Sequence, residues 1–292
     1  MPEPTAPSIV ETPLQPSSGS ETVGRRLIDL PWWFIGIVLV ILWAGVGILT
    51  RPNFNEAFEW IRVGIVTTLL TSVTAYLMAI VLGLLTGLGR MSHNVVIRNI
   101  ARLYVELVRG IPMLVLIFFI AFVGVPLGID LLHSLGEWFA SIGLSVLANF
   151  LAGLENQAVP MLARAIIALA VTYGAFLAEV FRAGIQSIGR GQMEAARSLG
   201  MGYGQAMRFV ILPQAIRNIL PALGNDFVSM VKDSSLVSVL AVRDMTQIAR
   251  LYAGSTFRFR EAYVTLSVLY LTMTVILSLG VATIERRLRK HE

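Results

Sequence analysis

Long stretches without a charged side chain divide this chain, and they constrain its fold more than any other feature. Only 14% of its 292 residues are charged, 55% are hydrophobic, and the mean hydropathy is +0.73. An average soluble domain is about one-quarter charged. A soluble fold of this size could not cover so much apolar surface with polar side chains. We therefore expect an all-α polytopic membrane protein with lipid around most of it.

Six segments are long enough to cross a bilayer, which takes about 20 apolar residues. They are residues 32–50, 63–89, 110–129, 158–180, 216–242 and 262–284. The segment 216–242 carries charged side chains but is counted as a span because of its length. The stretch 138–154 is also apolar, but as a seventh span it would reverse the orientation of everything after it. We expect it to form an interfacial or re-entrant helix.

The charges in the loops predict how these spans are oriented in the membrane. Arginines precede the first span (Arg25 and Arg26), occur in the loops 90–102 and 182–213, and follow the last span. The positive-inside rule therefore predicts that both termini are cytoplasmic. Residues 126–157 contain three acids and no Lys or Arg, which predicts an extracytoplasmic insert. The arginine-rich loop 243–260 should also face outward and is an exception. Residues 1–30 are rich in Pro and Ser and predict a disordered cytoplasmic tail.

Composition argues against several classes of function. The chain has no Cys, which excludes disulfides and thiol catalysis. Its two lysines, Lys232 and Lys290, do not occur in a P-loop pattern, so we expect ATP hydrolysis elsewhere. The three histidines are scattered without metal-ligand spacing. The arginines lie between apolar runs and not on a solvated face, which argues against nucleic acid. We expect no catalytic residue, metal or cofactor.

The segment 187–213 reads SIGRGQMEAARSLGMGYGQAMRFVILP. Glu194 is expected in the first turn of a short helix, where the helix dipole favours an acid, and Gly200 is a natural C-terminal stop. A second short helix from Tyr203 shows apolar residues at i, i+3, i+4 and i+7. Pro213 is expected to interrupt it before the next span. From these residues alone, the segment is either a docking surface or an ordinary cytoplasmic loop.

The spacing of this segment resembles the EAA loop of ABC-importer permeases, E-A-A-x3-G-x9-I-x-L-P. The matching residues are Glu194, Ala195, Ala196, Gly200, Val210, Leu212 and Pro213, with Val210 where Ile is usual. Small Ala195 and Ala196 would let a partner approach closely. Runs beginning at Val105, Tyr173 and Pro213 are similar to one branch, the polar amino-acid permeases, and the resemblance covers about residues 67–288.

The resemblance implies a five-helix permease core within a domain of residues 61–292. An additional N-terminal span with a short outer loop (31–60) and the insert 126–157 would be additions to it. It also implies a place in the cell inner membrane and a set of partners. These are an ATP-binding cassette subunit dimer that receives the EAA loop, an extracytoplasmic amino-acid-binding protein, a second permease subunit (identical or paralogous) and a polar amino acid substrate.

Charged residues inside a span cost about 2.5–3.5 kcal/mol each and usually mark function. Lys232 and Asp233 are about 100° apart on a helix and do not face each other. Asp226 and Asp233 are seven residues apart on nearly one face, with Ser229 between them. This stripe either contacts a zwitterionic substrate or forms a structural ion network, and both alternatives stay open. Further candidates for the substrate pathway are Ser234, Thr68 and Ser72.

Two acid–base pairs at span ends have the i, i+3 spacing of ion pairs, Glu106 with Arg109 and Glu179 with Arg182. We expect structural roles for both, with the charges at headgroup level. Pro112 follows the first pair and is expected to kink its helix.

Two rival functions are a stand-alone secondary transporter and a membrane scaffold. A secondary transporter usually contains an internal inverted repeat, and no such repeat is visible in this sequence. Intramembrane charges in the segment 226–233 argue against a scaffold, since they are costly unless they serve a function.

Overall fold

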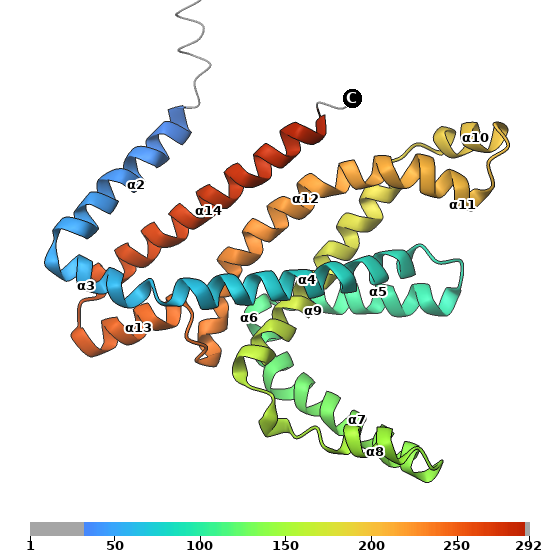
Figure 1. The fold of residues 1–292 in the computed structure, drawn as a ribbon, viewed down its shortest axis with the longest axis horizontal. Coiled ribbons are helices and arrows are strands. Elements are labelled where there is room, and N and C mark those ends of the chain that lie inside the picture. Colours follow the sequence, from blue (N-terminus) through green and yellow to red (C-terminus); the bar gives the residue numbers. More distant parts are fainter. Residues whose placement is uncertain (1–31, 290–292) are drawn as a thin grey trace, which may run out of the picture. The chain divides into compact units, whose positions relative to one another are not determined.

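The structure, a computed structural model, describes residues 32–289, and these form helices without a strand (Figure 1). The predicted tail 1–30, with Arg25 and Arg26, lies outside the described residues. The described residues divide between two units at residues 43 and 44. The first helix, α2 (Trp32–Thr50), crosses that boundary, and every later element belongs to the second unit.

Five helical stretches are long and apolar enough to cross a membrane, which confirms the all-α polytopic class. They are Trp32–Thr50, Pro52–Arg90, Met113–Ser141, Met161–Gln186 and Phe259–Arg287. The sixth predicted span corresponds to α12 (Leu212–Asp233), which has 22 residues but is not among the five. Its charged side chains lower its hydropathy, and its passage through the membrane stays a prediction.

The third span begins later than its apolar run suggests. Helix α5 (Val95–Gly110) ends before Ile111, whose backbone is extended at φ −108° and ψ 136°. The next residue, Pro112, disfavours the α conformation of its predecessor, so the helix breaks completely and does not merely kink. The span then runs through three consecutive elements, α6 (Met113–Phe119), the π-helix η1 (Ile120–Gly124) and α7 (Val125–Ser141).

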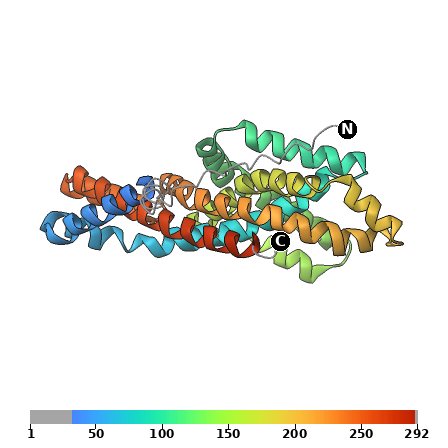
Figure 2. The same cartoon turned by 90° about the horizontal axis from the view of Figure 1, so that it is seen from above.

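The main core forms where α4 (Gly64–Arg90) and α9 (Met161–Gln186) pack along much of their length. Glycines on α4 permit this close approach. A Cβ at Gly83 would lie 2.7 Å from the Leu177 Cβ, and one at Gly87 would lie 2.9 Å from the Ala178 carbonyl oxygen. Small residues play this role between helices in lipid. Figure 2 shows α9 between α5 on one side and α12 on the other.

A second core joins α3 (Pro52–Ile61), α13 (Met245–Thr256) and α14 (Phe259–Arg289). Its buried residues are Ala57, Ile61, Met245, Ala249, Tyr252, Ala253, Ala262 and Leu266. The same region contains the arginine-rich loop that breaks the charge alternation. Arg258 lies 2.5 Å from a Glu56 carboxylate oxygen, and Arg260 lies 3.5 Å from Glu261. Nearby acids therefore offset part of the positive charge of this loop.

Helix α13 begins with a buried cap. Asp244 has no exposed surface, and its Oδ1 accepts a hydrogen bond from the Gln247 amide at 2.8 Å. Its Oδ2 is buried without a hydrogen-bond partner in the described part of the chain. Burial raises the pKa of the Asp244 carboxyl to about 6, although hydrogen bonds from the Gln247 and Thr246 amides oppose the shift.

We expect protonation of Asp244 to stabilise the folded chain. Its folded pKa of about 6 lies above the unfolded value of about 3.9, so this stability is present at low pH and is lost as pH rises through 6. Asp244→Asn keeps a capping oxygen and should raise the free energy of unfolding at pH 7 by at most about 3 kcal/mol. Unfolding midpoints between pH 4 and 7.5 test this. Exposed Asp130→Asn is the control. If the unfolding midpoint depends on pH equally in Asp244→Asn and in wild type, the prediction is wrong.

The predicted insert is a helical hairpin. The stretch 138–154 holds the end of α7, a turn at Gly143 with φ +84°, and α8 (Ser145–Ala152). Eight residues of helix extend only about 12 Å, so no single helix of spanning length covers the stretch. The hairpin closes where Gly136 meets α8, since a Cβ there would lie 3.2 Å from the Ala148 carbonyl oxygen. A 3₁₀ turn, η2 (Asn156–Ala158), then leads to α9.

Candidate functional site: a projecting helical loop and a polar face on α12

The segment predicted as a coupling loop folds into two short helical pieces. Helix α10 (Arg190–Ser198) ends because Gly200 adopts φ +84°, with the Met201 amide donating to the Ala196 carbonyl at 3.2 Å. This is a glycine-based C-cap. Because α10 begins at Arg190, Glu194 lies beyond the first turn and not within it as expected. The second piece is α11 (Tyr203–Ala206), which continues into the π-helix η3 (Met207–Ile211).

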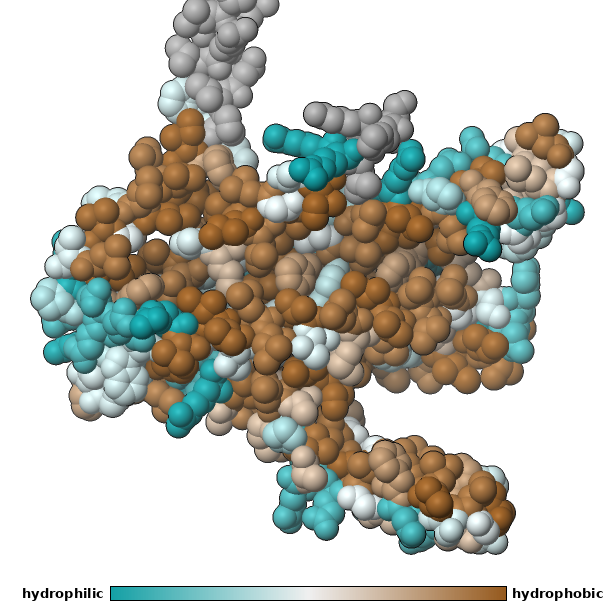
Figure 3. Space-filling view, viewed as in Figure 1, coloured by the Kyte–Doolittle hydropathy of each residue, from teal (hydrophilic) through white to brown (hydrophobic). Residues whose placement is uncertain are grey.

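The three alanines of this loop differ in exposure. Ala196 is 4% exposed and Ala206 is fully buried, where α10 packs on α11 and η3. Ala195 and Glu194 are exposed. The turn between the helices carries Leu199 at 82% exposure, an unusual place for a large apolar side chain. Figure 1 shows α10 and α11 beyond the end of α12, and Figure 3 shows hydrophobic side chains at this tip among hydrophilic ones.

Pro213 does not interrupt the chain's helical path. It is the second residue of α12, and its fixed φ of about −65° suits a helix. The turn before it is π-helical, and the Leu212 amide donates to the Met207 carbonyl. Val210 is half-buried, and its carbonyl accepts from Gln214 Nε2 at 2.9 Å. The projecting loop is therefore joined to α12 by continuous helix, which transmits a displacement better than a flexible linker does.

The α12 acids meet tyrosines from neighbouring helices. Tyr173 of α9 donates from its hydroxyl to Asp233 Oδ2 at 2.7 Å. Tyr76 of α4 donates to the Leu223 carbonyl oxygen, and Asp226 interacts electrostatically with both tyrosines. The structure thus brings Asp226 and Asp233 to one polar face beside two phenols. Neither tyrosine was expected as a site residue, although Tyr173 begins one of the runs that resemble amino-acid permeases.

The other candidates for the substrate pathway lie apart from that face or serve the backbone. Lys232 is exposed, and Ser229 is half-buried without a side-chain hydrogen bond in residues 32–289. Buried Thr68 accepts from the Met245 amide at 3.2 Å, and the Ser72 hydroxyl donates to the Thr68 carbonyl at 2.7 Å. The Ser234 hydroxyl donates to the Val231 carbonyl at 2.8 Å. Thr68 therefore joins α4 to the start of α13, whereas the Ser72 hydroxyl bonds within α4.

Glu179 is the centre of a larger ion cluster than the expected pair. Its carboxylate is 2.8 Å from Arg182 Nη2, contacts Arg90 Nη1, and is 3.4 Å from Arg109 Nη1. Arg109 therefore turns toward α9 and away from Glu106 on its own helix. Glu106 has no ion pair within the described residues. The i, i+3 spacing predicted the Glu179–Arg182 contact but not the two contacts between helices, because those depend on tertiary packing.

Arg164 is a buried cation whose role sequence reasoning missed. Only 6% of it is exposed, and its guanidinium donates to three carbonyl oxygens. Nη1 reaches Ala121 O in the π-helix η1 at 2.8 Å, Nη2 reaches Asn156 O at 2.7 Å, and Nε reaches Val159 O at 3.1 Å. A second contact joins Nη2 to the Asn156 side-chain oxygen at 2.7 Å. Arg164 therefore ties the third span to the segment that enters α9.

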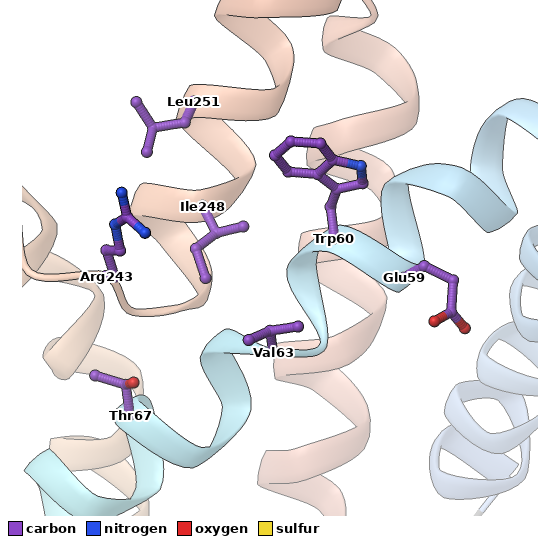
Figure 4. Close-up of a pocket in the computed structure, with 7 residues that line it drawn as sticks. All are labelled: Glu59, Trp60, Val63, Thr67, Arg243, Ile248 and Leu251. Carbon is purple, nitrogen blue, oxygen red and sulfur yellow. The ribbon is translucent and has the colours of Figure 1, made fainter.

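A cavity of about 630 Å³ lies beside α13 and is mostly apolar (Figure 4). Trp60, Ile248 and Leu251 surround it, with the Arg243 guanidinium on one side. Glu59 points away from the cavity in Figure 4 and is 2.5 Å from Arg62. No acid therefore faces Arg243 across this cavity, so it does not match both charges of a zwitterion.

Comparison with known proteins accounts for this combination of long apolar helices and a projecting loop. Residues 79–290 match the family described as the inner membrane component of binding-protein-dependent transport systems. This chain belongs to that family. The matched region contains the projecting loop and the α12 acids, whereas α2 and α3 precede it.

Relatives of this permease include named amino-acid transporters. It is 39% identical over 235 residues to the probable glutamine ABC transporter permease protein GlnM of Bacillus subtilis (strain 168), covering 80% of this chain and 96% of the relative. It is 32% identical to the arginine transport system permease protein ArgU of Corynebacterium glutamicum, covering 88% and 80%. A crystal structure of an amino acid ABC transporter with histidines matches with a TM-score of 0.65 at 35% identity, covering 82% of this chain and 97% of that one.

Proposed function

We propose that this permease forms half of the translocation pathway of an ATP-driven importer for polar amino acids, with a second permease subunit as the other half. A binding protein would deliver the substrate from outside, and a separate ATP-binding subunit dimer would supply energy in the cytoplasm. The observation that carries the proposal is the exposed tip of the 187–213 loop, held on continuous helix to α12. Family membership and the names of the relatives support the same assignment.

The loop has the properties of a docking element. Leu199 and Tyr203 are 82% and 63% exposed, so they present apolar area that nothing in the described chain covers. Exposed Glu194 adds a negative charge beside them. Apolar and aromatic anchors with a charged rim are typical of protein interfaces. From the positive-inside rule we expect this loop and both termini on the cytoplasmic side of the inner membrane, where ATP is available.

The polar face of α12 suits an amino-acid substrate. Asp233 and Asp226 can attract an ammonium group, and the Tyr173 and Tyr76 hydroxyls offer neutral hydrogen-bonding groups close by. Relatives that are named for glutamine and arginine transport support a polar side chain in the substrate. The alternative role of these acids is to hold α9 and α12 together through the Tyr173 contact.

Asp233→Asn separates the two roles. The amide can still accept from Tyr173, so we expect normal assembly, while loss of the charge should reduce amino-acid uptake at least tenfold, as expected for a charge-assisted hydrogen bond. The measurement is substrate-stimulated ATP hydrolysis and uptake in liposomes containing the complete transporter, tested across the amino acids. Exposed Asp130→Asn is the matched control.

Two results would count against the proposal. Loss of the assembled complex in Asp233→Asn would assign the acid to structure. If the wild-type complex shows no ATP hydrolysis that depends on an amino acid, the importer assignment itself is wrong.

A further inference from the structure

A second, smaller cavity lies where α4, α5 and α9 converge. Its volume is about 400 Å³, and its lining is Arg90, Arg102, Glu106, Arg182 and Gln186. Three arginines face one glutamate, which gives the lining a net charge of +2. Every lining side chain is polar, in contrast to the mostly apolar cavity beside α13.

The charges around this cavity do not neutralise one another. Glu179 contacts Arg90, Arg109 and Arg182, so one carboxylate serves three cations. When Glu179 and Arg109 are counted with the lining residues, four arginines still face only two glutamates. Arg102 has no ion pair within residues 32–289. The Arg90 Nε is buried and has no hydrogen-bond partner in the described chain. The cluster therefore carries surplus positive charge, and exposed Arg102 is its accessible unpaired cation.

The outer face of α5 beside the cavity is apolar. Ile100, Leu103 and Leu107 are 64%, 60% and 56% exposed and lie at i, i+3 and i+7 on one side of the helix. Around the helix, Arg102 is about 100° and Glu106 about 60° from Leu103, and both line the cavity. A ligand with a negatively charged head and a hydrocarbon tail would satisfy both surfaces at once.

We propose that this cavity binds the phosphate group of an anionic phospholipid, with Arg102 as its main free cation. A single acyl chain then lies along Ile100, Leu103 and Leu107. Arginine is well suited to phosphate because its planar donors pair with two oxygens. The loop charges predict that the ends of α4 and α9 face the cytoplasm, and basic pockets between helices on that side bind anionic headgroups. This site is separate from the α12 acids and does not depend on the transported substrate.

Lipid titration of the purified full-length chain in neutral detergent tests the site. Binding of phosphatidylglycerol, phosphatidylcholine and inorganic phosphate is measured by native mass spectrometry. We expect phosphatidylglycerol to bind at least tenfold more tightly than phosphatidylcholine. Millimolar inorganic phosphate should not displace it, since free phosphate lacks the tail. Equal affinity for the two lipids overturns the proposal, and displacement by inorganic phosphate overturns the lipid as the source of the phosphate.

Variants at Arg102 make the test specific to the cavity. Arg102→Gln should weaken phosphatidylglycerol binding about tenfold, whereas Arg102→Lys, which keeps the charge, should retain most of the affinity. Because Arg102 is exposed and unpaired, neither variant should lower the thermal unfolding midpoint. Arg287→Gln, an exposed basic residue on α14, is the matched control and should bind like wild type. Unchanged affinity in Arg102→Gln overturns the proposal.

Discussion

Leu199→Asp is expected to uncouple this permease from its ATP-binding partner while leaving the chain folded. Leu199 is 82% exposed, so the substitution removes no core contact and should change the free energy of unfolding by less than about 0.5 kcal/mol. At an interface, the same change places a charge where an apolar anchor was buried. Losing such an anchor costs about 2 kcal/mol or more, which corresponds to roughly 30-fold weaker association. Substrate-stimulated ATP hydrolysis in liposomes should fall to the unstimulated rate.

Val146→Asp is the matched control for this experiment. Val146 is 85% exposed in the first turn of α8, where the helix dipole tolerates an acid. It lies outside the 187–213 loop and should keep normal stimulation. Co-purification of the ATP-binding subunit provides a second measurement. If Leu199→Asp retains both the subunit and full stimulation, the tip of the loop is not the docking surface.

Arg164→Met is expected to produce the largest loss of stability of any single substitution considered for this chain. The apolar side chain has a similar length but leaves the Ala121, Asn156 and Val159 carbonyl oxygens without their donor. Each buried acceptor left without a donor costs about 1–3 kcal/mol, so we expect a loss of about 3 kcal/mol or more, and unmet carbonyl groups are especially costly where water is scarce. Denaturant unfolding of the purified chain in detergent measures the difference.

Arg164→Lys should recover less than half of that loss. An ammonium group is a compact donor and cannot reach acceptors spread over three residues in the way a guanidinium fork does. Arg250→Met, at an exposed arginine of α13, should stay within about 0.5 kcal/mol of wild type. Wild-type stability in Arg164→Met would show that the neighbouring carbonyl groups find other partners.

Elements with a strong one-dimensional pattern were predictable. Five predicted spans correspond to the five long apolar helices, because about 20 predominantly apolar residues have few alternatives to a helix in lipid. The helix break at Gly200 also follows from one residue, since glycine adopts φ +84° without a steric penalty. Predictions from local patterns were wrong where one residue type is compatible with two structures. Pro213 reads as an interruption, but at the second position of α12 it continues the helix.

Side-chain partners that are distant in the sequence were not predictable in this way. The Tyr173–Asp233 contact joins residues 60 apart, and the Arg90–Glu179 contact joins residues 89 apart. In the sequence, Arg164 is only a charge near the end of a span. Its partners are backbone carbonyl groups, which every residue has, so no residue type identifies them. Glu106 illustrates the converse, since its i, i+3 partner Arg109 contacts Glu179 instead.

Hydropathy and short-range spacing are properties of neighbouring residues, so they were enough to predict a helical membrane protein with a loop at 187–213 that resembles its family's. The folded structure was needed to show which charges are neutralised, which donors are left over at Arg90 and Arg102, and that Leu199 is uncovered. Those outcomes depend on how α4, α5, α9 and α12 pack. Packing is set by the shapes of side chains that meet only after the chain has folded.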